Sequence, residues 1–133
     1  KNMMEGKKQW IYKKQLEFSN RVNGKQIKVK TRTPSYLEKR TWKLALKTGI
    51  TPSKVIVKNL KSRWGSATKT GIINLSMALT KAPSEVIDYI IIHELSHLKV
   101  HDHSQKFWNI VYKFDKNYKE KISWLEIHGI KII

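Results

Sequence analysis

Four of the five histidines in this 133-residue chain lie in one short segment, HELSHLKVHDH, which runs from His93 to His103. Residues four apart on a helix share a face, so His93 and His97 can turn both imidazoles toward one cation. Glu94 projects about 100° away from His93 on the same helix, where a carboxylate can take a proton from metal-bound water. This H-E-x-x-H spacing is typical of zinc hydrolases and predicts one zinc ion per chain.

A catalytic zinc ion takes three protein ligands and keeps one position for water. His101 continues the helical spacing, but eight helical residues place it about 12 Å along the axis from the first histidine, too far for a shared ion. The helix must therefore end soon after His97, and we expect the chain to fold back so that His103 supplies the third ligand. A carboxylate farther along the chain, Glu120 or Glu126, is the alternative third ligand.

The residues alone leave other interpretations of this segment open. A histidine on an apolar helix is often a hydrogen-bonded core residue that binds nothing. A structural zinc site, closed by four protein ligands, would make the protein a basic binding module rather than an enzyme. A metal-activated water can also attack a phosphoanhydride, so a nucleotide hydrolase and a peptidase share the same predicted site.

The elements around the segment must position these side chains. Pro83 opens a helix because its missing N–H would have no partner in the first turn. The apolar residues that follow cover most of the helix circumference, so we expect this helix to be buried. Ser104 can cap the next helix, at about residues 105–114, and a last helix is expected at about residues 118–127.

Upstream of the active-site helix, the pattern predicts one helix and two strands. Ser35 can cap a helix at about residues 36–47, which the following glycine ends. The β-branched alternation of SKVIVKNL, residues 53–60, predicts a strand, and IINLSMAL, residues 72–79, predicts a second one. The intervening RWGSATKTG, residues 63–71, indicates a bulge or turn. Together these elements predict one α+β domain.

The beginning of the chain has a weaker pattern. Residues 7–21 are compatible with a helix, and residues 26–31 alternate like a short strand after an Asn-Gly turn. We therefore expect a helix and hairpin extension over residues 1–33, followed by the domain that carries the histidines over residues 34–133.

A longer series of motifs resembles the YgjP-like metallopeptidase domain, a small zincin-like family related in its core to SprT-like and minigluzincin proteins. The motifs are Arg63-Trp64-Gly65-Ser66, Asn74-Leu75, Ala82-Pro83 followed by VIDY, His93-Glu94-Leu95-Ser96-His97, and His103-Ser104 followed by Phe107-Trp108. The resemblance runs from about residue 41 to residue 125. The chain departs from the family pattern at Ala67, where a cysteine is usual, and in a β-rich N-terminal portion that is shortened or missing.

This resemblance implies a twisted, mostly antiparallel sheet over the active-site helix, with an edge strand near the cleft and helices at the C-terminal end. The zinc ligands of the family fall on His93, His97 and His103. Its catalytic glutamate falls on Glu94, which implies a metallopeptidase that acts on a peptide or protein. The sequence leaves open whether Asp102 supports a ligand or caps the following helix.

Several further residues are candidates for the cleft. Arg63 can orient an anionic or carbonyl oxygen, although a structural role is equally expected. Trp64 lines the cleft or, alternatively, packs in the core. Phe107 and Trp108 are expected to be core residues that hold the loop of the third histidine. The candidates for stabilising the transition state are Arg63, Tyr112, Tyr118 and His128.

The charge of the chain is one-sided, with 27 Lys and Arg against 10 Asp and Glu, a formal net charge of +17. Such a field attracts nucleic acid or another polyanion, which is a candidate partner beside the peptide substrate. Cysteine is absent, which excludes thiolate metal ligands and fits a reducing compartment. The longest apolar run, residues 86–92, is too short to span a membrane, so we expect a cytoplasmic protein with no membrane partner.

Overall fold

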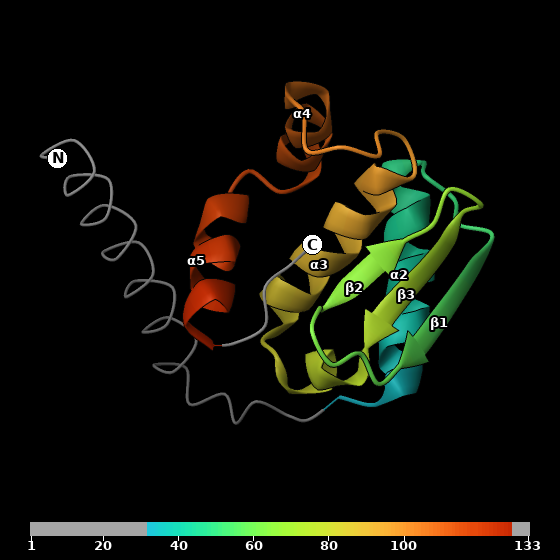
Figure 1. The fold of residues 1–133 in the computed structure, drawn as a ribbon, viewed down its shortest axis with the longest axis vertical. Coiled ribbons are helices and arrows are strands. Elements are labelled where there is room, and N and C mark those ends of the chain that lie inside the picture. Colours follow the sequence, from blue (N-terminus) through green and yellow to red (C-terminus); the bar gives the residue numbers. More distant parts are fainter. Residues whose placement is uncertain (1–31, 129–133) are drawn as a thin grey trace, which may run out of the picture.

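The structure, a computed structural model, describes residues 32–128. Its elements are α2 Pro34–Thr48, β1 Lys54–Lys58, β2 Gly65–Ala67, β3 Ile72–Ser76, the 3-10 helix η1 Met77–Lys81, α3 Ser84–His97, α4 Gln105–Phe114 and α5 Tyr118–His128 (Figure 1). The expected α+β class is confirmed. The extension expected over residues 1–33 lies almost entirely outside the described residues. None of the helices within 32–128 is both long and apolar enough to cross a membrane.

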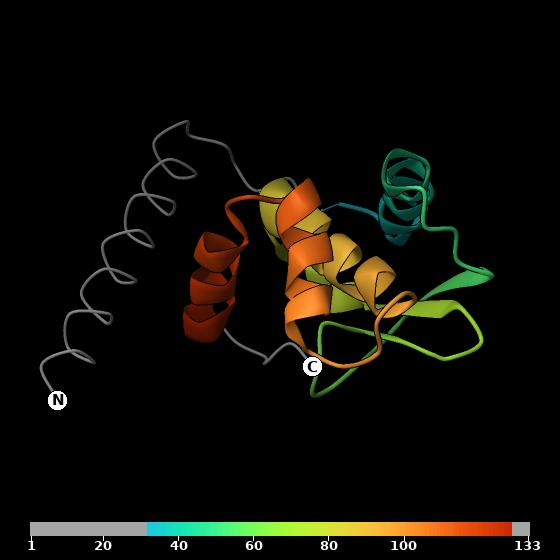
Figure 2. The same cartoon turned by 90° about the horizontal axis from the view of Figure 1, so that it is seen from above.

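Helix α3 occupies the centre of the domain (Figures 1 and 2). It contacts α2, α4, α5, β2 and β3, so other elements cover it on all sides. Between Val86 and His97 every residue is buried except Asp88, which confirms the burial expected from the apolar pattern. Asp88 accepts two hydrogen bonds from the Arg40 guanidinium, of 2.8 and 2.7 Å, and so joins α3 to α2 at their polar edge.

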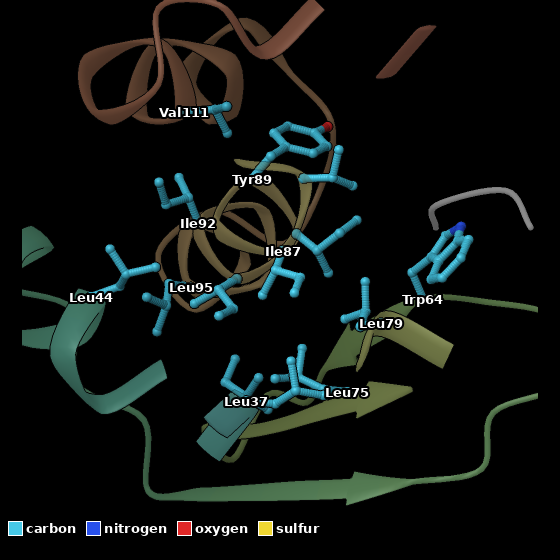
Figure 3. Packing of buried hydrophobic residues seen from close by; sticks show 14 of the residues in the cluster. Leu37, Leu44, Trp64, Leu75, Leu79, Ile87, Tyr89, Ile92, Leu95 and Val111 are labelled. Carbon is cyan, nitrogen blue, oxygen red and sulfur yellow. The ribbon is translucent and has the colours of Figure 1, made fainter. Parts of the chain in front are cut away.

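The hydrophobic core holds α3 from opposite directions. Figure 3 shows side chains of α2 and β3 meeting one side of the helix, while Val111 of α4 approaches from the other. Burying one such aliphatic side chain contributes about 1.5–3 kcal/mol, so the helix is anchored by several contacts of that size. The histidines that α3 carries therefore sit on a rigid support.

The sheet is mixed, with the strand order β1-β3-β2. Strands β2 and β3 pair antiparallel, but β1 runs parallel to β3, with Lys54 opposite Ile72 and Lys58 opposite Ser76. The expectation of a mostly antiparallel sheet is therefore wrong for β1. The reason is the short connection over residues 59–64, which crosses the C-terminal end of β3 and places β1 and β2 on its two sides. Strand β1 must end where this connection begins, so β1 and β3 end at the same edge of the sheet and run in the same direction.

Strand β2 falls inside the segment that was expected to be only a bulge or turn. Gly65–Ala67 forms the strand, and the turn is confined to Thr68–Gly71, where the Thr68 carbonyl accepts a hydrogen bond of 3.1 Å from the Gly71 amide. The strand expected over residues 72–79 ends earlier, at Ser76, because the Ser76 hydroxyl accepts a hydrogen bond from the amide of Ala78 and starts η1.

The helix boundaries agree closely with those expected, but the capping contacts differ. Helix α4 follows Ser104 as predicted, although the Ser104 side chain makes no capping hydrogen bond. Helix α3 begins at Ser84, so Pro83 stands just before the first turn rather than in it. Helix α2 begins earlier than expected, because Thr33 rather than Ser35 caps it by accepting a hydrogen bond from the Tyr36 amide, and Pro34 occupies the first turn. The cap at its other end is Gly49, with a φ of 76° that favours glycine.

Candidate metal centre

Helix α3 supplies two of the histidines from its last turns. His93 and His97 lie one turn apart, and only 2% and 7% of their surfaces are exposed. The helix ends at His97, and the amides of the next three residues bond back to carbonyls of its last turn. This tight ending redirects the chain, as the placement of a third histidine required.

The loop between α3 and α4 carries His103 back over the end of the helix. The Oδ1 atom of Asp102 accepts a hydrogen bond of 3.0 Å from the Ser104 amide and shapes the turn before α4. In the resulting arrangement, the Nε2 atom of His103 lies 3.1 Å from Nε2 of His97 and 3.4 Å from Nε2 of His93. Three imidazole nitrogens from two elements thus converge on one point.

This spacing fits a zinc ion. Three nitrogens that bind one zinc at about 2.0–2.1 Å with tetrahedral angles lie roughly 3.3 Å apart. Among residues 32–128, His93, His97 and His103 form a group whose ligand atoms all lie within 4.8 Å of one another, and no fourth His, Asp or Glu joins it. The alternative ligands Glu120 and Glu126 lie on α5, outside this group.

The outward nitrogens of the two helical histidines are also engaged. The Nδ1 atom of His97 lies 3.1 Å from the carbonyl oxygen of Val100. A carbonyl can only accept, so Nδ1 carries the proton and Nε2 is free to bind a metal. The Nδ1 atom of His93 lies 3.1 Å from the hydroxyl of Tyr89. Burial lowers the pKa of His97 and raises the pKa of Tyr89, so it favours the neutral imidazole of His97 and the neutral phenol of Tyr89.

Aromatic rings from α4 line the histidines, and a ring from α5 covers one of those α4 rings. Phe107 stacks on His97 with a centroid distance of 4.2 Å and an interplanar angle of 23°. Trp108 stacks on His103 at 6.0 Å, and Tyr118 covers the Trp108 ring at 5.1 Å. Phe107 is fully buried, while Trp108 is partly buried. These contacts hold the exposed His103 in place, which is the role expected of Phe107 and Trp108.

The Glu94 side chain is completely buried, and within residues 32–128 neither of its carboxylate oxygens has a hydrogen-bond partner. Burial raises the pKa of Glu94 to about 8, and the positive charge of Arg63 opposes this rise. A carboxylate that is buried without partners costs free energy. Burial therefore favours the protonated form of this carboxyl group relative to an exposed glutamate.

The other candidate residues are placed as follows. Arg63 is half-buried and close enough to Glu94 for its charge to affect the carboxyl pKa. Trp64 is 6% exposed and belongs to the hydrophobic core, which was the alternative to a place in the cleft. Tyr112 is 53% exposed on α4. His101, rejected as a ligand for its distance along the helix, is exposed.

Two residues at the site were not assigned their observed roles from the sequence. Tyr89 bonds to His93, and the only signal for it was a hydroxyl-bearing residue four positions before a ligand. Gly65 was expected to permit a bulge. In the structure it allows β2 to approach Glu94, because a Cβ atom there would lie 3.2 Å from Glu94 Cγ and 3.4 Å from Oε2.

Comparisons with known proteins agree with this geometry. A model of the YgjP-like metallopeptidase domain matches residues 26–128. The chain is similar to the metallopeptidase zymogen of Pyrococcus abyssi abylysin, with 25% identity and a TM-score of 0.63 over 76% of this chain and 100% of that chain. It shares its fold with the metallopeptidase zymogen of Methanocaldococcus jannaschii jannalysin, with 24% identity and a TM-score of 0.58 over 69% and 93% of the two chains. Curated proteins gave no significant match.

Proposed function

The chain belongs to the YgjP-like metallopeptidase family, and on this premise we propose that it is a zinc-dependent peptidase with Glu94 as its general base. The observation that supports this most directly is that Nε2 of His103 lies 3.1 Å from Nε2 of His97 and 3.4 Å from Nε2 of His93. His93 and His97 lie on α3, the helix that also carries the buried Glu94 carboxylate.

The three histidines are the proposed zinc ligands. Three imidazole nitrogens, with a fourth position left for water, are typical of a catalytic zinc site, whereas a structural site has four protein ligands. The described residues place no fourth ligand in the cluster, which favours the enzyme over a binding module with structural zinc. When bound, zinc lowers the pKa of a water molecule to about 7 and polarises the substrate carbonyl.

Glu94 performs the proton transfers in this proposal. It accepts a proton from the attacking water at one carboxylate oxygen and later returns that proton to the nitrogen of the leaving amine, so the carboxylate ends unchanged. A base works best when its pKa lies near the working pH, and in the metal-free protein burial raises the pKa of Glu94 above the usual range of a carboxyl group. Neither oxygen is occupied by a hydrogen bond within the described residues, so no structural hydrogen bond has to break before the carboxylate takes a proton.

The peptide substrate is proposed to lie along β2. Among residues 32–128 this strand pairs with β3 on one side only, and an extended peptide can add to such an edge through backbone hydrogen bonds. The close packing of Gly65 against Glu94 puts this edge next to the catalytic carboxylate. Arg63 directly precedes β2, where its guanidinium can bind a carbonyl or carboxylate oxygen of the substrate.

A panel of peptides and nucleotides tests this function. The zinc-loaded protein should cleave peptides, lose activity with a chelator and regain it with zinc. Glu94→Gln should bind one zinc ion per chain as tightly as the wild type and cleave about 10²–10⁴-fold more slowly. Full activity of Glu94→Gln would rule out the general base. Hydrolysis of phosphoanhydrides without peptide cleavage would identify a phosphohydrolase instead.

A further inference from the structure

We propose that Tyr89 is a positioning residue for the metal site: its phenol oxygen accepts the Nδ1 proton of His93 and thereby keeps the Nε2 atom of His93 bare and aimed at the metal. This inference rests on the proposed zinc site. Its basis is the contact of 3.1 Å between the Tyr89 hydroxyl and Nδ1 of His93.

The geometry of this contact is fixed because both residues lie on the buried helix α3. Tyr89 and His93 lie one turn apart on α3, with ring centroids 5.7 Å apart and an interplanar angle of 67°. Tyr89 is fully buried, and Figure 3 shows its ring projecting from α3 on the side that faces α4. A buried ring on a buried helix has little freedom to turn, so the hydroxyl stays at the histidine.

The protonation state of His93 gives the hydroxyl its role. A neutral imidazole carries one proton, and a nitrogen that bears it cannot bind a metal. A hydroxyl can either accept from Nδ1 or donate to it. Only the first arrangement leaves Nε2 bare, so in this proposal the hydroxyl is the acceptor from Nδ1. Partners on the far nitrogen of a metal-binding histidine fix its tautomer and orientation in this way.

The two histidines of α3 differ in the group that faces their Nδ1 atom. His97 faces the backbone carbonyl of Val100, which no substitution removes and which only accepts. The partner of His93 is the Tyr89 side chain, and a substitution can remove its oxygen while keeping its ring. The site therefore contains one histidine whose Nδ1 atom faces a replaceable hydroxyl.

Zinc affinity of Tyr89→Phe, measured by competition with a chromogenic chelator, tests the proposal. We expect zinc to bind about 10–100-fold more weakly than in the wild type, while far-UV circular dichroism and the thermal midpoint show that the metal-free variant is folded. Tyr36→Phe is the matched control, because Tyr36 lies on α2, which carries none of the three histidines. Its zinc affinity should equal that of the wild type. An affinity of Tyr89→Phe within twofold of the wild type would overturn the proposal.

Nitrogen NMR provides a test that does not depend on a variant folding. In the zinc-loaded wild type, His93 should show a protonated Nδ1 whose hydrogen exchanges slowly with solvent. A His93 that binds zinc through Nδ1 would contradict the positioning role of Tyr89 but not the proposed zinc site. A wild type that binds no zinc at all would overturn the proposed function as well, so the two failures are distinguishable.

Discussion

Gly65 in β2 lies directly against Glu94 in α3: a Cβ atom at residue 65 would stand 3.2 Å from Glu94 Cγ and 3.0 Å from the carbonyl oxygen of Asn74. Neither neighbour can move without cost, because the carbonyl belongs to the central strand of the sheet and the Glu94 side chain is completely buried. The missing side chain therefore sets the distance between the edge strand and the carboxylate.

Gly65→Ala should impair catalysis more than metal binding. The added methyl group must displace either β2 or the Glu94 side chain, at a cost of about 1–3 kcal/mol in the free energy of unfolding. A catalytic group that is displaced by about 1 Å can lose about 10²-fold in rate. We expect kcat to fall by at least about tenfold, with zinc affinity unchanged because the three atoms nearest to the added methyl group belong to Asn74 and Glu94 and not to a histidine.

Gly49→Ala is the matched control for this substitution. Gly49 has a φ of 76°, and no atom lies within 4 Å of a Cβ built there. Alanine at this position costs stability through backbone strain of about 1 kcal/mol, at the end of α2. Its kcat should equal that of the wild type. A Gly65→Ala enzyme with unchanged kcat would show that β2 does not position Glu94.

The third ligand can be tested with a pair of neighbouring histidines. His103→Ala should lower zinc affinity by more than the roughly 100-fold that follows loss of a supporting partner, because it removes a nitrogen from the metal itself. His101→Ala should leave the affinity within twofold, since His101 is exposed and outside the cluster. Equal affinities of both variants in a chelator competition would point to a carboxylate of α5 as the third ligand.

The stability of the metal-free protein should depend on the ionisation of Glu94. Its pKa rises from 4.5 to about 8 because of burial, so the native state holds this proton more tightly than the unfolded state. The resulting stability is complete below about pH 4.5 and is lost as the pH rises to about 8. Glu94→Gln cannot ionise and avoids this loss.

Urea denaturation of the two metal-free proteins measures this effect. The free energy of unfolding of Glu94→Gln, minus that of the wild type, should increase between about pH 5 and pH 8. Taking the difference removes the contribution of the other titrating groups. A difference that stays constant over this range would show that the carboxyl is not destabilised by burial.

The charge of Arg63 should influence the pH below which the enzyme loses activity. Arg63 lowers the pKa of Glu94, so its replacement by a neutral residue raises that pKa further. A base that protonates at higher pH loses activity at higher pH. In Arg63→Gln, the acidic limb of the profile of kcat/KM against pH should therefore move to higher pH. Arg63→Lys keeps the charge and should move the limb less; equal shifts in both variants would exclude the electrostatic explanation.

The sequence determined the features that depend on neighbouring residues. Pro83, Gly49 and Ser104 marked helix ends correctly, because the backbone conformation at a helix end depends on the residue there and its neighbours. The apolar circumference of residues 86–98 predicted a buried helix. The four-residue spacing of His93 and His97 followed from helix geometry alone, and the limited reach of a helix indicated a third ligand after a chain reversal.

The tertiary structure decided what depends on distant segments. The parallel pairing of β1 with β3 follows from a crossing connection, and the three residues of β2 are too few to show an alternating pattern. The contact of Gly65 with Glu94 and the solvent exclusion that raises the Glu94 pKa exist only once the sheet lies on α3. Local patterns encode where elements begin and end, whereas burial and approach between elements are set by packing over the whole domain.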